Sequence, residues 1–116
     1  MALDDEFVRR AERNRSHLDE FDLDDTAYLD WAVIVAFYTA LRWVDAYFSP
    51  NRPTDHPERN AWVARDSHTR PIYREYRELH QLSVEARYGL REFEPDEVKA
   101  LVANRLSRVE AHMRRQ

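Results

Sequence analysis

Apolar residues recur along most of the chain with the three- and four-residue spacing of amphipathic helices, and no stretch alternates with the two-residue period of a strand. The first predicted helix covers Asp4 to Phe21. Acidic residues crowd its start, where the positive end of the helix dipole favours them. The polar run "DLDD" follows and ends it. The helix is predicted to bury one apolar stripe, formed by Phe7, Ala11, Leu18 and Phe21.

The second predicted helix begins at Asp25 or Thr26, since either residue is a good N-cap. It ends at Phe48, because the residue that precedes Pro50 is disfavoured in the helical region. The side chains of this helix are apolar on almost every side of it. We therefore expect it to be the central element of the fold.

A third, shorter helix is predicted to start at Asp55 and to end near residues 65–67. Asp55 and Glu58 have the spacing of a capping box, and a proline lies in the first turn. The fourth helix is expected to open at Thr69 or Arg70 and to reach Tyr88. Its predicted inward stripe is Ile72, Tyr76, Leu79, Leu82, Ser83 and Ala86.

Gly89 is well placed to terminate the fourth helix. The fifth helix is predicted from Pro95 to the basic residues near position 115, where cations suit the negative end of the dipole. Its inward stripe is predicted to be Val98, Leu101, Val102, Leu106, Val109 and Met113.

Short connections make sequential helices antiparallel neighbours. The sequence therefore predicts an all-α, up-and-down four-helix bundle with one additional short helix. At 116 residues the chain is expected to form one domain, residues 1–116.

The amino-acid composition excludes several kinds of functional site. The chain has no cysteine, which excludes disulfides, thiolate zinc sites and cysteine nucleophiles. Its histidines are scattered, with no carboxylates at metal-ligand spacing and no glycine-rich phosphate loop. We therefore predict neither a metal nor a cofactor. The acidic N-terminus lacks an apolar signal core, and together with the absence of cysteine this favours a cytoplasmic location.

The apolar run Trp31–Phe48 does not predict a membrane span, because Arg42 and Asp45 lie inside it and charges at that depth are costly. Charge is also uneven. Residues 1–30 hold ten acids and four arginines, net −6, whereas residues 31–116 hold twelve acids and fourteen bases, net +2. Contact with a nucleic acid would therefore need a local arginine patch.

Arg42 and Asp45 are three residues apart, so both can project from one face of the second helix. Three interpretations are open. The two residues can form a buried structural ion pair, they can lie on a homodimer interface, or Arg42 can belong to a cleft that binds phosphate or a nucleotide.

Residues 31–88 resemble the HEPN superfamily of small helical-bundle proteins, in particular its small prokaryotic members. The resemblance is carried by "DWAVIVAFYTALRWVDAYF", "HPERN" and "IYREYRELHQLSVEARY". It implies a bundle that often dimerises. Many members are metal-independent ribonucleases of toxin–antitoxin, phage-defence or CRISPR systems, whereas others bind nucleotides or are inactive scaffolds.

Active members carry an arginine, commonly followed by a polar residue, and a histidine after four to six intervening residues. In this chain Arg59 is followed by Asn60, but eight residues separate Arg59 from His68. Arg42 also stands where similar sequences are expected to have histidine. Three other pairs meet the spacing, a number that chance alone produces: Arg10–His17, Arg74–His80 and Arg105–His112.

The predicted catalytic residues are His56, Arg59 and Arg42. A neutral His56 would accept the 2′-hydroxyl proton, and the two arginines would stabilise the charge on the phosphorane. The alternative is structural: His56 is an ordinary residue of the first helical turn, and Arg59 pairs with Asp55 or Glu58.

Arg65, Arg70 and Arg87 are the predicted contacts to RNA or a nucleotide. Arginines interleaved with tyrosines can bind single strands, but a solvated helix face has the same pattern. For Arg87 the alternative is a structural bond to the last helix carbonyls or to Asp45.

Two functions are therefore open. The first is a HEPN-like module of a prokaryotic defence or toxin–antitoxin type system, binding RNA or a nucleotide, with metal-independent ribonuclease activity left undecided. The expected partners are a second copy of the chain and an antitoxin or larger protein. The second function is a non-catalytic helical dimerisation or adaptor protein.

Overall fold

The computed structural model describes residues 2–115, and these contain helices but no strand. The prediction of an all-α fold is therefore confirmed. In chain order the helices are α1 (Asp5–Asp19), α2 (Leu29–Phe48), α3 (His56–Arg65), the 3₁₀ turn η1 (Arg70–Ile72), α4 (Tyr73–Arg87), α5 (Pro95–Ala100), the π segment η2 (Leu101–Leu106) and α6 (Ser107–Arg114).

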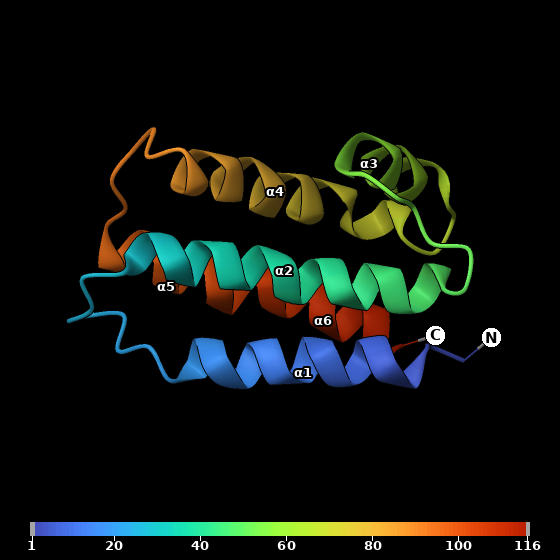
Figure 1. Ribbon diagram of the computed structural model, residues 1–116, viewed down its shortest axis with the longest axis horizontal. Coiled ribbons are helices and arrows are strands. Elements are labelled where there is room, and N and C mark those ends of the chain that lie inside the picture. The colour runs from blue at the N-terminus through green and yellow to red at the C-terminus, as the bar shows by residue number, and fades with distance from the viewer. Residues whose placement is uncertain (1, 116) are drawn as a thin grey trace.

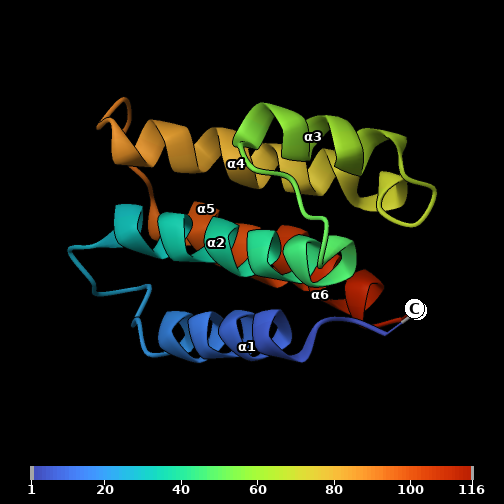
Figure 2. The same ribbon diagram turned by 45° about the vertical axis from the view of Figure 1, so that its right-hand side comes forward.

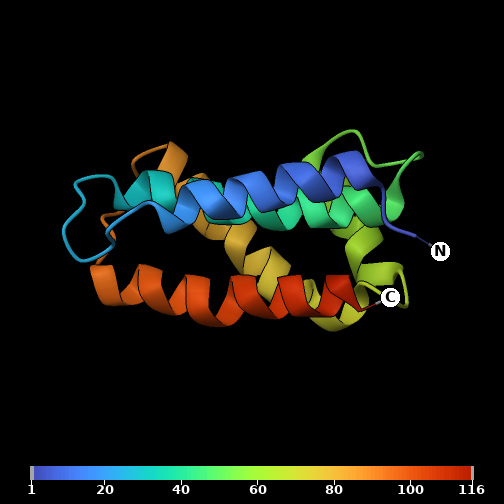
Figure 3. The ribbon, with the colours of Figure 1, turned by 90° about the horizontal axis from the view of Figure 1, so that it is seen from below.

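The four long helical segments run alternately in opposite directions (Figure 1). The short α3 lies beside α4, on the layer opposite α1 (Figure 2). Seen from below, α5, η2 and α6 form one continuous rod (Figure 3). The central helix is α2, which packs against α1, α4 and this rod.

The core is built around α2, as the apolar pattern predicts. Nine of its apolar side chains are at most 3% exposed: Ala32, Val33, Ala36, Phe37, Ala40, Leu41, Trp43, Val44 and Ala46. Each large side chain of this kind contributes about 1.5–3 kcal/mol when fully buried. Within residues 2–115 no helix combines the length and the apolar character needed to cross a bilayer.

The predicted start of α2 was wrong. The helix begins at Leu29, three or four residues later than expected. Asp22 accepts a hydrogen bond from the Asp24 N–H at 3.1 Å, and Thr26 accepts one from the Tyr28 N–H at 3.0 Å. These side chains bond to nearby backbone in turns, which is the local competition that keeps such residues out of helices.

Other helix ends follow the predicted chemistry. Asp55 caps α3 by accepting a hydrogen bond from the Glu58 N–H at 2.8 Å. Gly89 has a φ of +62°, and the Leu90 N–H donates to the Glu85 carbonyl at 2.9 Å. This is the Schellman arrangement that glycine favours after a helix.

The last helix differs from the prediction in its middle turn. Its predicted stripe is buried except for the half-buried Val102, but residues Leu101–Leu106 are wound as a π-helix. Ser107 Oγ donates to the Val102 carbonyl at 2.9 Å, which occupies an acceptor in the widened turn. Apolar spacing alone does not distinguish this winding from an ordinary α-helix.

Glu110 of α6 is an acid placed in the core, only 5% exposed. Arg15 Nη1 of α1 lies 3.5 Å from its Oε1, and its Oε2 has no hydrogen-bond partner among the described residues. Burial raises the pKa of Glu110, although Arg15 and Arg114 oppose this. Folding therefore makes this carboxyl harder to ionise than it is in the unfolded chain.

We predict that Glu110→Gln stabilises the protein at pH 8. A raised pKa means that the stability contributed by the protonated acid is lost as pH rises through the folded-state pKa. A neutral glutamine avoids that loss and should raise the free energy of unfolding at pH 8. Urea titrations at pH 8 and pH 5 measure it, with the exposed Glu12→Gln as the control. A Glu110→Gln variant less stable than the wild type at pH 8 contradicts the assignment.

Candidate functional site

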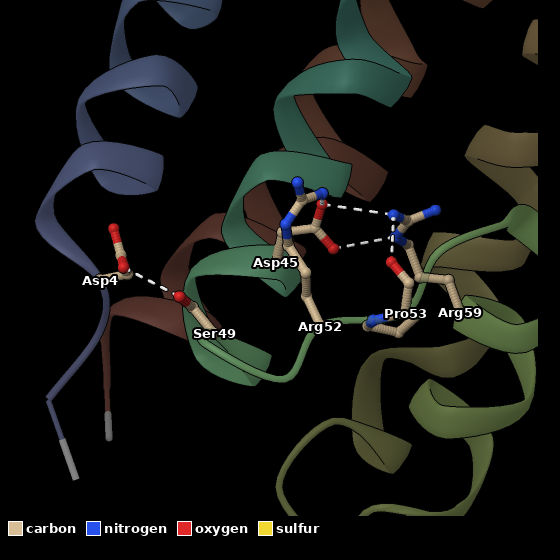
Figure 4. Close-up of polar contacts among 6 residues, drawn as sticks. All are labelled: Asp4, Asp45, Ser49, Arg52, Pro53 and Arg59. Carbon is tan, nitrogen blue, oxygen red and sulfur yellow. Dashed lines mark hydrogen bonds and ion pairs between the residues drawn. The ribbon is translucent and has the colours of Figure 1, made fainter.

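A buried ion pair joins α2 to α3. Asp45 is fully buried and Arg59 is 5% exposed. Arg59 Nε donates to Asp45 Oδ1 at 2.9 Å and its Nη2 donates to Oδ2 at 3.3 Å (Figure 4). The same Nη2 donates to the Pro53 carbonyl at 3.2 Å. This two-pronged geometry is the strong form of an arginine–carboxylate contact.

Two neighbouring contacts extend this junction. Arg52 Nη1 lies 3.6 Å from Asp45 Oδ2, so a second guanidinium faces the same carboxylate. Ser49 Oγ donates to Asp4 Oδ2 at 2.9 Å, which ties the start of α1 to the end of α2 (Figure 4). The junction therefore fixes the loop between α2 and α3 at both ends.

The interpretation of Arg42 and Asp45 as a mutual ion pair was wrong. Asp45 pairs with Arg59 and Arg52, and no ion pair joins it to Arg42. Arg42 is half-buried on α2, one turn after Tyr38. The pairing of Arg59 with Asp55 or Glu58 was also wrong, because Arg59 turns inward to Asp45. As a result, Arg59 can contact a phosphate only by leaving a buried carboxylate.

Two histidines from different helices meet beside this junction. His56 is the first residue of α3 and His80 lies in the middle of α4, and their ring centroids are 4.7 Å apart. Both rings pack on Phe37 of α2, His80 by stacking at 5.0 Å and His56 in a tilted contact at 5.6 Å. Phe37 is fully buried and forms the floor under both imidazoles.

The hydrogen bonds of the two rings differ. Asn60 Nδ2 lies 3.1 Å from His80 Nδ1. An amide nitrogen only donates, so His80 Nδ1 accepts and the proton of a neutral ring lies on Nε2. His56 Nδ1 is buried without a hydrogen-bond partner among the described residues. His56 Nε2 is thus the nitrogen through which this ring would engage a ligand.

Both imidazoles are held neutral at pH 7. Burial lowers the pKa of His80 to about 4, and the nearby His56 ring and the positive charge of Arg87 act in the same direction. Burial also lowers the pKa of His56, with Arg59 and Arg87 adding to the effect. A neutral imidazole offers both a lone pair and an N–H group, as an acid–base site requires.

Arg87 supplies an exposed positive charge at the same place. Its Nη1 donates to Tyr38 Oη of α2 at 3.4 Å, and its charge acts on both imidazoles. The alternative in which Arg87 bonds to Asp45 was wrong, because Asp45 pairs with Arg59 and Arg52. We call the group formed by His56, Asn60, His80, Arg87 and Tyr38 the His56–His80 site.

The arrangement combines two neutral imidazoles with one solvent-facing guanidinium. This set can accept a proton, donate a hydrogen bond and neutralise an anion, which are the tasks of phosphodiester cleavage without a metal. In the part of the chain that the structure describes, no three potential ligands gather as a metal-binding group.

The structure brings together only part of the residues singled out from sequence. His56 and Arg87 belong to the His56–His80 site, whereas Arg59 lies beneath it as a support. Arg65 and Arg70 are exposed, at the end of α3 and in η1 respectively. Their proposed contact with RNA stays a prediction.

Sequence reasoning missed His80 and Asn60. Spacing had separated His68 from the Arg59–Asn60 pair, and in the structure His68 stacks on His112 with ring centroids 4.8 Å apart. Asn60 instead meets His80 from α4. One signal was available: His80 lies four residues after the inward-facing Tyr76, which places it at the edge of the predicted inward stripe.

No family model matches the chain, and neither a curated protein nor a solved structure does. Its functional assignment therefore rests on the geometry of its own residues.

We predict that Asp45→Asn lowers the free energy of unfolding by about 3–5 kcal/mol, because it leaves the Arg59 guanidinium buried without a counter-ion. Chemical denaturation at pH 7 measures the loss. Glu6→Gln is the matched control, since it removes the carboxylate of the exposed Glu6–Arg10 pair and should cost less than about 1 kcal/mol. Equal losses in the two variants would show that the buried pair contributes no more to stability than the exposed Glu6–Arg10 pair does.

The lowered pKa of His80 predicts a loss of stability in acid. The unfolded chain binds a proton near pH 6.5 and the folded protein only near pH 4, so stability falls as pH decreases through this window. His80→Phe removes this contribution and keeps the ring on Phe37. Between pH 7 and pH 4 the wild type should lose about 1–2 kcal/mol more than the variant, allowing for partial solvent screening. Parallel pH dependences in urea titrations would refute the assignment.

Proposed function

We propose that the chain is a HEPN-like module that binds RNA or a nucleotide phosphate at the His56–His80 site and cleaves RNA there without a metal. The observation that carries the proposal is the 4.7 Å approach of two neutral imidazoles beside the exposed Arg87. The resemblance in residues 31–88 supports the same conclusion and suggests a cytoplasmic defence or toxin–antitoxin setting with an antitoxin or a larger protein as partner.

In this proposal the chemistry begins at His56. Its Nε2 accepts the proton of a ribose 2′-hydroxyl, and the 2′-oxygen attacks the adjacent phosphorus. Arg87 and the His80 Nε2–H stabilise the negative charge that develops on the phosphorane oxygens. The bond from phosphorus to the 5′-oxygen then breaks, and protonated His56 returns its proton to that oxygen. The products are a 2′,3′-cyclic phosphate and a 5′-hydroxyl.

The arginines of α2 and α3 have different parts in this scheme. Arg59 is a positioning residue, because its bond to Asp45 fixes the helix that starts with His56. Arg42 follows Tyr38 by one helical turn, so its charge can extend the anion-binding side of the site toward the end of α2.

The test is cleavage of a fluorescently labelled single-stranded RNA by the purified protein in EDTA. We expect 2′,3′-cyclic phosphate ends, and we expect His56→Ala and His80→Ala each to lower the rate by about 100-fold or more. His17→Ala is the matched control, since His17 lies on α1 with its side chain 61% exposed, and it should leave the rate unchanged. Cleavage that persists in both site variants contradicts the proposal.

A specific observation favours the second candidate, a dimerisation or adaptor protein. Four large side chains are exposed where the start of α2 adjoins the end of α4: Tyr28 (61%), Trp31 (56%), Tyr88 (71%) and Leu90 (68%). The two helix ends together line a hollow of about 340 Å³. Clustered exposed apolar side chains mark interaction surfaces, and a second copy of the chain is the occupant that the resemblance suggests. A wild-type protein that neither binds nor cuts RNA would leave this candidate as the account of the molecule.

A further inference from the structure

A band of exposed arginines follows the line along which α4 packs against η2 and α6. The two helices run antiparallel here, since Arg105 pairs with Glu78 and Arg108 pairs with Glu75. We call this band the arginine face. Its members are Arg74, Arg77, Arg105, Arg108 and Arg115, with Glu75 and Glu78 between them.

The arginine face is hollowed along its length. A hollow of about 450 Å³ is lined by Tyr73, Arg74 and Arg77, and a second of about 250 Å³ lies next to it, because Glu78 lines both. A third hollow of about 330 Å³ has Arg108 and Arg115 in its lining. The arginines of α4 and α6 therefore stand beside concave surface that a chain-like ligand could follow.

The two carboxylates of the face do not neutralise it. Glu78 forms an ion pair with Arg105, and Glu75 Oε2 lies 3.7 Å from Arg108 Nε. No ion pair within residues 2–115 engages the other three arginines, which are Arg74, Arg77 and Arg115. Their guanidinium groups are exposed and can form two-pronged contacts with phosphate.

The charge of this face is opposite to that of the protein as a whole. Its five arginines and two glutamates give a net charge of 5 − 2 = +3, so all other residues together carry −4 − 3 = −7. A positive band on an acidic protein concentrates its attraction for polyanions in one place and repels them elsewhere. Non-specific binding over the whole surface is thereby disfavoured.

The arginine face adjoins the His56–His80 site. Arg77 and His80 are three residues apart on α4, so they lie on neighbouring parts of one helix surface. The positive charge of Arg77 also acts on the His80 imidazole. A backbone bound along α4 would therefore reach the two imidazoles at its edge.

We propose that the arginine face binds the phosphate backbone of single-stranded RNA and leads the strand to the His56–His80 site. This inference rests on the proposed function. A flexible single strand suits the face, because the unpaired arginines come from α4 and from the residue that follows α6, and phosphates spaced along such a strand can contact both places. Continuity with a site suited to phosphodiester chemistry favours RNA over an acidic protein.

Binding can be measured separately from cleavage with a fluorescently labelled 2′-O-methyl RNA of about 12 nucleotides, which has no reactive 2′-hydroxyl and matches the site size of single-strand binders. Fluorescence anisotropy over a range of salt concentrations gives the affinity and its salt dependence. With three unpaired arginines on phosphates, the plot of log affinity against log salt concentration should have a slope of about −2.

The double variant Arg74→Gln/Arg115→Gln should lower the affinity at low salt by about tenfold and reduce the slope to about −0.7. The matched control is Arg9→Gln/Arg13→Gln, which removes two exposed arginines of α1 and should bind as the wild type does. Each double variant removes two positive charges, so a general effect of net charge would alter the affinity of the two variants alike.

An affinity and slope unchanged in Arg74→Gln/Arg115→Gln, or lowered equally in the α1 control, would overturn the inference. So would a polyglutamate peptide that binds this face when the RNA does not, because the partner would then be an acidic protein. RNA that binds with the expected slope and is not cleaved in its unmodified form would refute the proposed catalysis and support the arginine face as a binding surface.

Discussion

The ion pair between Asp45 and Arg59 is the constraint on which the rest of the site depends. Both groups are withdrawn from water, and a buried charge is tolerated only when it is paired and hydrogen-bonded. The pair therefore fixes where the short α3 can lie, and the Pro53 carbonyl adds a third contact to the same guanidinium. Because α3 begins with His56, the position of this imidazole over Phe37 and against His80 follows from a contact made several residues away.

The arginines around the two imidazoles differ in burial. Burial is the main reason that both rings stay neutral, and the charges of Arg59 and Arg87 add to it, but only Arg87 is exposed to meet an anion. Arg59 is satisfied by Asp45, so the positive charge nearest the core has a structural role, and the outer charge of Arg87 is the one that we propose to bind an anion. On the far side of His80 the arginine face continues the positive surface along α4. The acidic remainder of the protein leaves this region as the place where a polyanion is attracted.

Periodicity was enough to predict the helices, the central position of α2 and the end of α4 at Gly89, because these depend on local spacing and local backbone preference. Periodicity did not predict which side chains pair with one another when the partners lie on different helices. Spacing favoured Arg42 for Asp45, whereas the actual partner, Arg59, is fourteen residues away and is chosen by how α3 packs. His80 was overlooked for the same reason, since its partners His56 and Asn60 come from another helix. The late start of α2 and the π winding of η2 depend on single side-chain to backbone bonds that no period reveals.

The most direct test of the account is an NMR titration of the five histidine imidazoles in the folded wild type and in folded Asp45→Asn at low temperature. If the ion pair holds His56 against His80, the wild type should show a His80 pKa near 4, and the variant should show that pKa rising toward the ordinary value of 6.5. A His80 pKa near 6.5 in the wild type, or one that stays low after the pair is broken, would contradict the account.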